Sequence, residues 1–88
     1  MKDKILIYYS PFSAASQIWL VKDGKASSGH ISSSLEELSE NVVGLAYSQN
    51  IFDVAVSAPY ALMNEIITAV RDQENSSYST NKINIEVM

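Results

Sequence analysis

Hydrophobic residues along the chain fall into short segments whose lengths and spacing predict a mixed α/β fold. The first segment, Ile5-Leu6-Ile7-Tyr8-Tyr9, is a continuous apolar and aromatic run of strand length, which predicts a central strand covered on both faces. Residues 17–21 predict a second strand, and Asp23-Gly24 after it is the pair that favours a tight type I′ hairpin turn. Residues 26–31 have weak β propensity and an interior glycine, so we expect an exposed edge strand with room for a bulge.

A capping box predicts the start of the first helix. Ser33 with Glu36, or Ser34 with Glu37, can satisfy each other's unpaired backbone donors. Apolar residues then recur at steps of three and four and make one stripe that faces a sheet: Leu35, Leu38, Val42, Val43, Leu45 and Ala46. We expect this helix to end near residues 49–50, where polar residues interrupt the stripe.

A strand, a second helix and a last strand complete the predicted order. Residues 52–56 form a short apolar run, which indicates another buried strand. The second helix is expected to begin at Pro59 or the residue after it, because proline suits a first helical turn, and to fray within residues 73–78. Residues 82–87 alternate apolar with polar, which turns three side chains toward the core: Ile83, Ile85 and Val87.

The order β-β-β-α-β-α-β predicts a single mixed five-stranded sheet with two helices packed on it. Right-handed crossovers place the strand after the first helix parallel to the first strand, and the last strand at the far edge. A chain of 88 residues buries only roughly 60–65% of its unfolded surface. We therefore expect one domain spanning residues 1–88, with no second domain and no cleft between domains.

This order of elements resembles the ribonuclease H-like topology, and residues 24–71 also look like its ribosomal-protein variant. The nuclease branch implies metal-binding carboxylates on the first strand, on the first helix and at the end of the fourth strand. The corresponding strand positions, Tyr8-Tyr9-Ser10 and Val56-Ser57-Ala58, carry no acid, and only helix glutamates such as Glu37 or Glu40 match. One carboxylate does not make a two-metal site, so a degenerate or metal-dependent nuclease is our third hypothesis, and we expect neither a metal nor a cofactor.

Charge and composition limit the classes of partner and of site that the chain can have. Ten acidic residues against six basic ones leave a net charge of −4, which argues against nucleic acid and against the RNA binding that the ribosomal branch implies. There is no cysteine, hence no disulfide framework and no thiol nucleophile. No apolar stretch approaches membrane-spanning length, and the start of the chain has too little apolar length for a signal peptide, so we expect a cytoplasmic protein.

Catalysis has little support in the sequence. His30 is the single histidine and the one obvious general base, yet no strained nucleophile turn of the Gly-x-Ser-x-Gly kind accompanies it. We expect His30 to be a solvent-exposed side chain on an edge strand. No catalytic residue and no metal ligand is predicted.

A crevice outside the carboxyl ends of the first and fourth strands is a candidate ligand site, because open α/β sheets bind ligands there. Small-residue turns follow both strands, and their hydroxyls and one aromatic ring could line such a site: Ser10, Phe12, Ser13, Ser57 and Tyr60. The alternative is that these serines only cap turns and the second helix. A small-ligand or nucleotide-binding domain is accordingly our second hypothesis.

Protein interaction is the leading hypothesis. An acidic cluster of Glu36, Glu37 and Glu40 could dock a basic partner, although acids at a helix start are common for reasons of stability alone. Trp19 belongs to a strand that two helices cannot fully cover, and Trp and Tyr are enriched where proteins meet. We therefore predict a non-enzymatic interaction module, an adaptor or inhibitor of a larger machine, that binds a protein partner or a second copy of itself.

Overall fold

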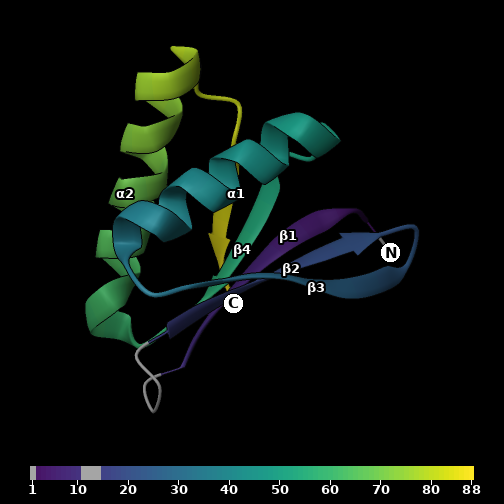
Figure 1. The fold of residues 1–88 in the computed structure, drawn as a ribbon, viewed down its shortest axis with the longest axis horizontal. Helices are drawn as coiled ribbons and strands as arrows, with labels where there is room; N and C mark the ends of the chain where they lie inside the picture. The colour runs from purple at the N-terminus through teal and green to yellow at the C-terminus, as the bar shows by residue number, and fades with distance from the viewer. Residues whose placement is uncertain (1, 11–14) are drawn as a thin grey trace.

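The computed structural model describes residues 2–10 and 15–88, and in it the chain forms one mixed sheet and two helices (Figure 1). The elements in chain order are β1 (Lys4–Ser10), β2 (Ala15–Lys22), β3 (Lys25–Ser32), α1 (Leu35–Gln49), β4 (Asp53–Ser57), α2 (Tyr60–Tyr78) and β5 (Asn84–Val87). The predicted mixed α/β architecture, a single sheet with two helices, is confirmed.

The strands lie in the order β3-β2-β1-β4-β5, with β1 in the centre. β2 pairs antiparallel with both of its neighbours, whereas β4 runs parallel to β1 and β5 runs parallel to β4. Tyr8 of β1 is level with Ser57 of β4, so the carboxyl ends of these two strands meet at the same edge of the sheet. Ser32, at the end of β3, reaches this edge as well, since it is level with Ser16 at the start of β2.

The β2–β3 hairpin forms as the sequence predicts. Asp23 and Gly24 have φ angles of 55° and 77°, the two positive values that a type I′ turn requires. β3 is an edge strand, and its pairing register with β2 shifts between Gln17 and Trp19. Gly29 lies at this irregularity, where an added Cβ would come within 3.0 Å of the Ile18 carbonyl oxygen, so only glycine fits without a shift of the backbone.

α1 begins and ends with the expected caps. The Ser34 hydroxyl accepts a hydrogen bond of 3.1 Å from the Glu37 amide, so Ser34 is the cap and Ser33 is not. The reciprocal bond of a capping box, from the Ser34 amide to the Glu37 carboxylate, is absent among the described residues. Asn50 ends the helix in the left-handed conformation, with φ of 56°, a role that asparagine performs well.

α2 begins at Tyr60, directly after Pro59, as predicted, and continues to Tyr78. Its end falls on the last residue of the predicted range, 73–78. Glu74 is fully buried and Tyr78 stacks on Tyr47 of α1 with ring centroids 3.7 Å apart, so contacts that the polar sequence does not reveal hold the last turns. In the described part of the chain no helix is long and apolar enough to cross a membrane.

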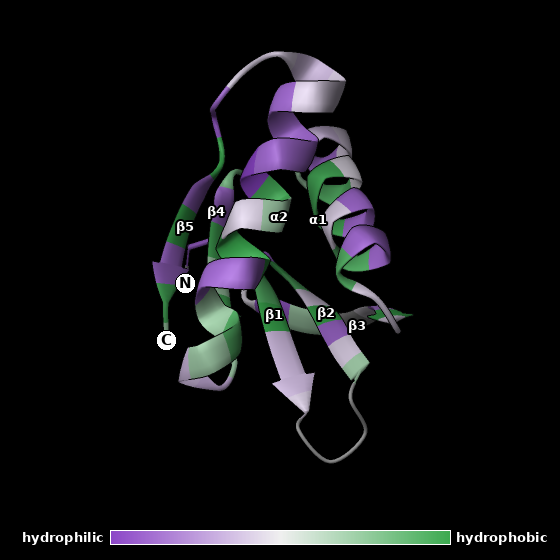
Figure 2. Cartoon of the chain, turned by 90° about the vertical axis from the view of Figure 1, so that its left-hand side faces the viewer, coloured by the Kyte–Doolittle hydropathy of each residue, from purple (hydrophilic) through white to green (hydrophobic). Residues whose placement is uncertain are grey.

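Both helices cover the same face of the sheet and contact each other (Figure 1). The molecule is accordingly thin, 19 Å along its shortest axis, as two layers require. Figure 2 shows hydrophobic colouring on the central strands β1 and β4 and alternating hydrophobic and polar turns on both helices. Between the layers lies one core: Ile5, Ile7, Ile18, Leu38, Val42, Val43, Ala46, Ile51, Val54, Val56, Met63, Ile66, Val70 and Ile83.

The prediction that β1 is covered on both faces is wrong. Ile5 and Ile7 face the helices and are buried, but Leu6 and Tyr8 point to the other face, where no described helix packs. The continuous apolar run of residues 5–9 therefore places apolar side chains on both faces of the sheet, although helices cover only one of these faces.

The last strand is shorter than predicted, and one of its inward residues is misassigned. Ile83, just before β5, is buried and Ile85 is partly buried, as expected, but Val87 is exposed. Val87 is level with Val56 on the helix side, yet β5 is the edge of the sheet, so nothing in the described chain covers it from outside.

Candidate functional site

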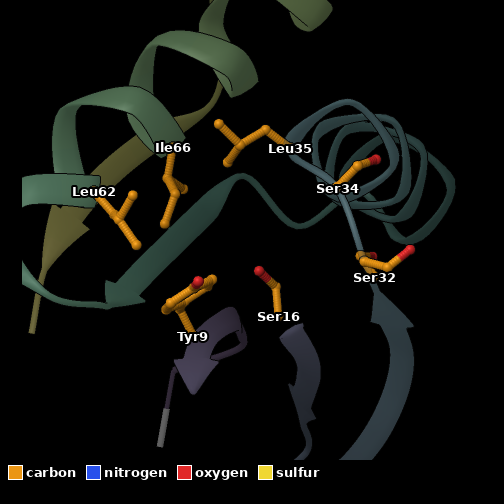
Figure 3. Close-up of a pocket in the computed structure, with 8 residues that line it drawn as sticks. Tyr9, Ser16, Ser32, Ser34, Leu35, Leu62 and Ile66 are labelled. Carbon is orange, nitrogen blue, oxygen red and sulfur yellow. The ribbon is translucent and has the colours of Figure 1, made fainter. Parts of the chain in front are cut away.

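A small pocket opens where the carboxyl ends of β1 and β3 meet the first turns of the two helices (Figure 3). Its volume is about 160 Å³. We call it the serine pocket, and its lining residues are Tyr9, Ser16, Ser32, Ser33, Ser34, Leu35, Leu62 and Ile66. It lies on the side of the sheet that carries the helices, and its lining residues differ from those predicted for a crevice beside the first and fourth strands.

The strand register brings the serines of this pocket together. Ser16 is level with Tyr9 on one neighbouring strand and with Ser32 on the other, so all three project toward the helices. The Ser32 hydroxyl accepts a hydrogen bond of 3.1 Å from the Asn41 side-chain amide, and the Ser34 hydroxyl caps α1. Ser16 is 5% exposed, and its hydroxyl has no hydrogen-bond partner among the described residues.

The opposite face of the sheet forms a second candidate surface, which we call the uncovered face. Its centre is a shallow hollow of about 350 Å³, lined by Leu6, Ile7, Tyr8, Trp19, Ser57 and Met88. Tyr8 also borders a neighbouring hollow of about 120 Å³ that reaches Ile31 on the edge strand β3. Tyr8 and Ile31 are 49% and 68% exposed, so apolar side chains occur from the central hollow to the edge strand β3.

Charges on the uncovered face cancel. Lys4 on β1 and Glu86 on β5 carry opposite signs on this face. Asp53 forms an ion pair of 3.0 Å with Lys2. Because two lysines and two acids surround an apolar centre, this face has no net charge of its own.

The predicted partner-binding residues do not form one surface. Trp19 lies on the uncovered face, level with Leu6. Glu36, Glu37 and Glu40 are exposed on α1, on the other side of the sheet. A single contact with a partner of modest size therefore engages either the tryptophan or the acidic cluster.

The predicted ligand-binding residues are also separated. Ser10 borders the hollow that contains Ile31, whereas Ser57 borders the hollow that contains Trp19. Tyr60 is 92% exposed at the start of α2. Phe12 and Ser13 lie outside the described residues, so their part in this prediction stays untested.

Ser16 is the residue that sequence reasoning missed. It stands next to the predicted second strand, with nothing local to mark it, and the Ser32-Ser33-Ser34 run was interpreted only as a helix cap. The hairpin turn at Asp23-Gly24 alone would place Ser16 opposite Ile31. The register shift between Gln17 and Trp19 moves Ser16 opposite Ser32, and the sequence does not show where that shift falls.

His30 is exposed on the edge strand β3, where the sequence placed it. Among residues 2–10 and 15–88, no three side chains of the types that bind metals gather closely enough to hold an ion together.

A buried carboxyl group ties α2 to the last strand. Oε2 of Glu74 accepts hydrogen bonds from the Tyr47 hydroxyl at 2.7 Å and from the amides of Lys82 and Ile83 at 2.9 and 3.1 Å. Thr80 also hydrogen bonds to Tyr47, and Arg71 donates to the Ile83 carbonyl oxygen. These contacts fix the loop between α2 and β5, so we assign the cluster a structural role.

Burial raises the pKa of the Tyr47 phenol above its ordinary value of 10.0, and the neighbouring Glu74 raises it further, while the hydrogen bond with Thr80 acts in the opposite direction. Since the folded state holds this proton more tightly than the unfolded chain, the contribution of Tyr47 to stability is complete below pH 10 and is lost as pH rises through the folded-state pKa.

Urea unfolding measured below and above the folded-state pKa of Tyr47 is expected to show a shallower alkaline loss of stability in Tyr47→Phe than in the wild type. Tyr60→Phe, at an exposed tyrosine, is the control and should behave as the wild type does; equal slopes for all three proteins would contradict this assignment.

Comparison with known proteins identifies no relative: no family model, no curated protein and no solved structure matches this chain.

Proposed function

We propose that the chain is a non-enzymatic protein-interaction module that associates through the uncovered face of its sheet. The observation that carries the proposal is the apolar hollow at the centre of this face, where no described helix packs. Tyr8 is half exposed there, and Leu6 and Trp19 are only partly buried. Tyr and Trp contribute large contact areas with few rotatable bonds, and they dominate the binding energy at protein interfaces.

A second copy of the chain is the occupant that the charge distribution supports. The two helices together carry six acidic residues and one arginine, a net charge of −5, so the remainder of the chain carries +1 of the total −4. Contact through the helices would bring two strongly acidic layers together, whereas contact through the uncovered faces keeps them on opposite outer sides. Two such faces meet without net repulsion, and each covers the apolar centre of the other.

We also propose that the fold is ribonuclease H-like. The strand order β3-β2-β1-β4-β5, with β2 antiparallel to the other four strands, supports this assignment, as does the succession of elements along the chain. An experimental structure that reproduces this order and the two helices on one face is the test. The interaction proposal does not depend on it.

Sedimentation equilibrium of the full chain tests the association. We expect a reversible dimer whose Kd is unchanged or lower at high salt, because the buried surface is apolar and its charges cancel. A chain that remains monomeric up to about 1 mM, where a Kd corresponds to only about −4 kcal/mol, would overturn the proposal. A dimer that dissociates steeply as salt is added would contradict the apolar contact and point to the charged helices.

A further inference from the structure

The serine pocket contains a polar group that the fold leaves without a partner. The backbone of Ser16 is fixed between two strands, and its hydroxyl points into the space between Tyr9 and Leu35 (Figure 3). The side chain is 5% exposed and makes no hydrogen bond to a described residue. Because Ser16 lines the open pocket, its hydroxyl is free to donate a hydrogen bond to a ligand that lies there.

The start of α1 forms a second wall of the same pocket. Ser33, Ser34 and Leu35 line it, and the positive end of the helix dipole lies there. The Glu37 amide donates to the Ser34 hydroxyl and the Leu38 amide donates to the Ser34 carbonyl oxygen. The amides of Leu35 and Glu36 have no acceptor in the described part of the chain, so the pocket meets hydrogen-bond donors from two independent elements, β2 and α1.

The residues that line the serine pocket determine which ligand charge it can accommodate. None of the eight lining residues carries a charge, and Glu36 and Glu37 are exposed in the first turn of α1. A phosphate with two negative charges would lack a cation and would face these acids. A single negative charge, spread over two oxygens, matches a hydroxyl and a helix start without arginine or lysine.

The remaining walls set the shape and size of the ligand. Leu62, Ile66 and the ring of Tyr9 are apolar and lie across from Ser32 and Ser34, and Leu35 adds an apolar side chain beside Ser34 (Figure 3). The volume of about 160 Å³ is close to the roughly 150 Å³ that admits benzene in an engineered cavity. It admits a handful of heavy atoms, which excludes a nucleotide.

We propose that the serine pocket binds a short-chain monocarboxylate, with the carboxylate on the Ser16 hydroxyl and the start of α1 and the alkyl tail against Leu62 and Ile66. This site lies on the helix side of the sheet, and Ser16 also borders the hollow that contains Tyr8 and Ile31.

Amide NMR spectra of the full chain, recorded while sodium butyrate is added at constant ionic strength, test the proposal. We expect saturable shifts centred on the amides of Ser16, Leu35 and Glu36, with a Kd in the millimolar range. Ser16→Ala should weaken binding about tenfold, the effect of losing one hydrogen bond to a charged group. Ser27→Ala, at an exposed serine of β3, should bind as the wild type does.

Two further ligands separate the contributions of charge and tail. 1-Butanol, which has the tail without the charge, and inorganic phosphate, which has charge without a tail, should each bind more weakly than butyrate. Absence of saturable shifts at Ser16 and Leu35, or binding of either control as tight as that of butyrate, would overturn the proposal. Because these outcomes are measured on the wild-type chain, they test the proposal even if Ser16→Ala fails to fold.

Discussion

Replacing Glu74 by alanine is expected to lower the free energy of unfolding by about 3 kcal/mol. The substitution removes the shared acceptor of three donors, the Tyr47 hydroxyl and the amides of Lys82 and Ile83. The two amides precede β5, so their loss also loosens the loop that positions this edge strand. A domain of this size is stable by only about 5–15 kcal/mol, and the melting temperature should fall by roughly 15 °C.

Glu74→Gln is the matched control. Its carbonyl oxygen can replace Oε2 as the acceptor, and its amide takes the place of Oε1, which is buried without a described hydrogen-bond partner. We expect a loss of about 1 kcal/mol or less. Equal unfolding free energies of Glu74→Ala and the wild type in urea would show that the buried carboxyl does not hold the loop.

Tyr8→Asp is expected to raise the dimer dissociation constant at least about tenfold. Tyr8 borders both hollows of the uncovered face, so an aspartate there removes an aromatic contact and places a charge at the two-fold contact of two copies. The side chain is half exposed and faces away from the core, so the folded monomer should tolerate the change at a cost of about 1 kcal/mol in strand propensity.

Tyr60→Asp carries the same substitution on an almost fully exposed tyrosine at the start of α2. It changes the net charge equally and should leave the dissociation constant as in the wild type. Sedimentation of the three proteins, with circular dichroism to verify folding, makes the comparison. Similar weakening by both variants would indicate that net charge, and not the uncovered face, governs association.

Turns and helix starts were predicted correctly wherever one or two residues determine the backbone conformation. Asp23-Gly24 made the hairpin turn, Ser34 with Glu37 made the cap of α1, and Pro59 marked the start of α2. Each of these signals acts through the conformation or the hydrogen bond of its own neighbourhood, so it needs no knowledge of the rest of the fold.

Tertiary contacts account for the errors. The polar sequence of residues 73–78 did not reveal that Glu74 is buried, because its hydrogen-bond donors lie on α1 and on the loop before β5. The run around Tyr8 looked like a strand covered on both faces, because hydrophobicity does not tell on which side the helices pack. The pocket around Ser16 depends on the register of two strand pairs, and no single segment contains that information.

The two proposed functions lie on opposite faces of one sheet. The helix side contains the core and the small serine pocket, and the other side offers an apolar surface without net charge. Trp19 belongs to that apolar surface, while the glutamates at the start of α1 remain on the outside of the proposed dimer.

A dilution series of amide NMR spectra, followed residue by residue, tests the central claim most directly. Concentration-dependent shifts are expected on Leu6, Tyr8 and Trp19, including the indole N–H, and the amides of α1 and α2 are expected to remain unchanged. Shifts confined to the helices, or spectra that do not change with concentration, would contradict association through the uncovered face.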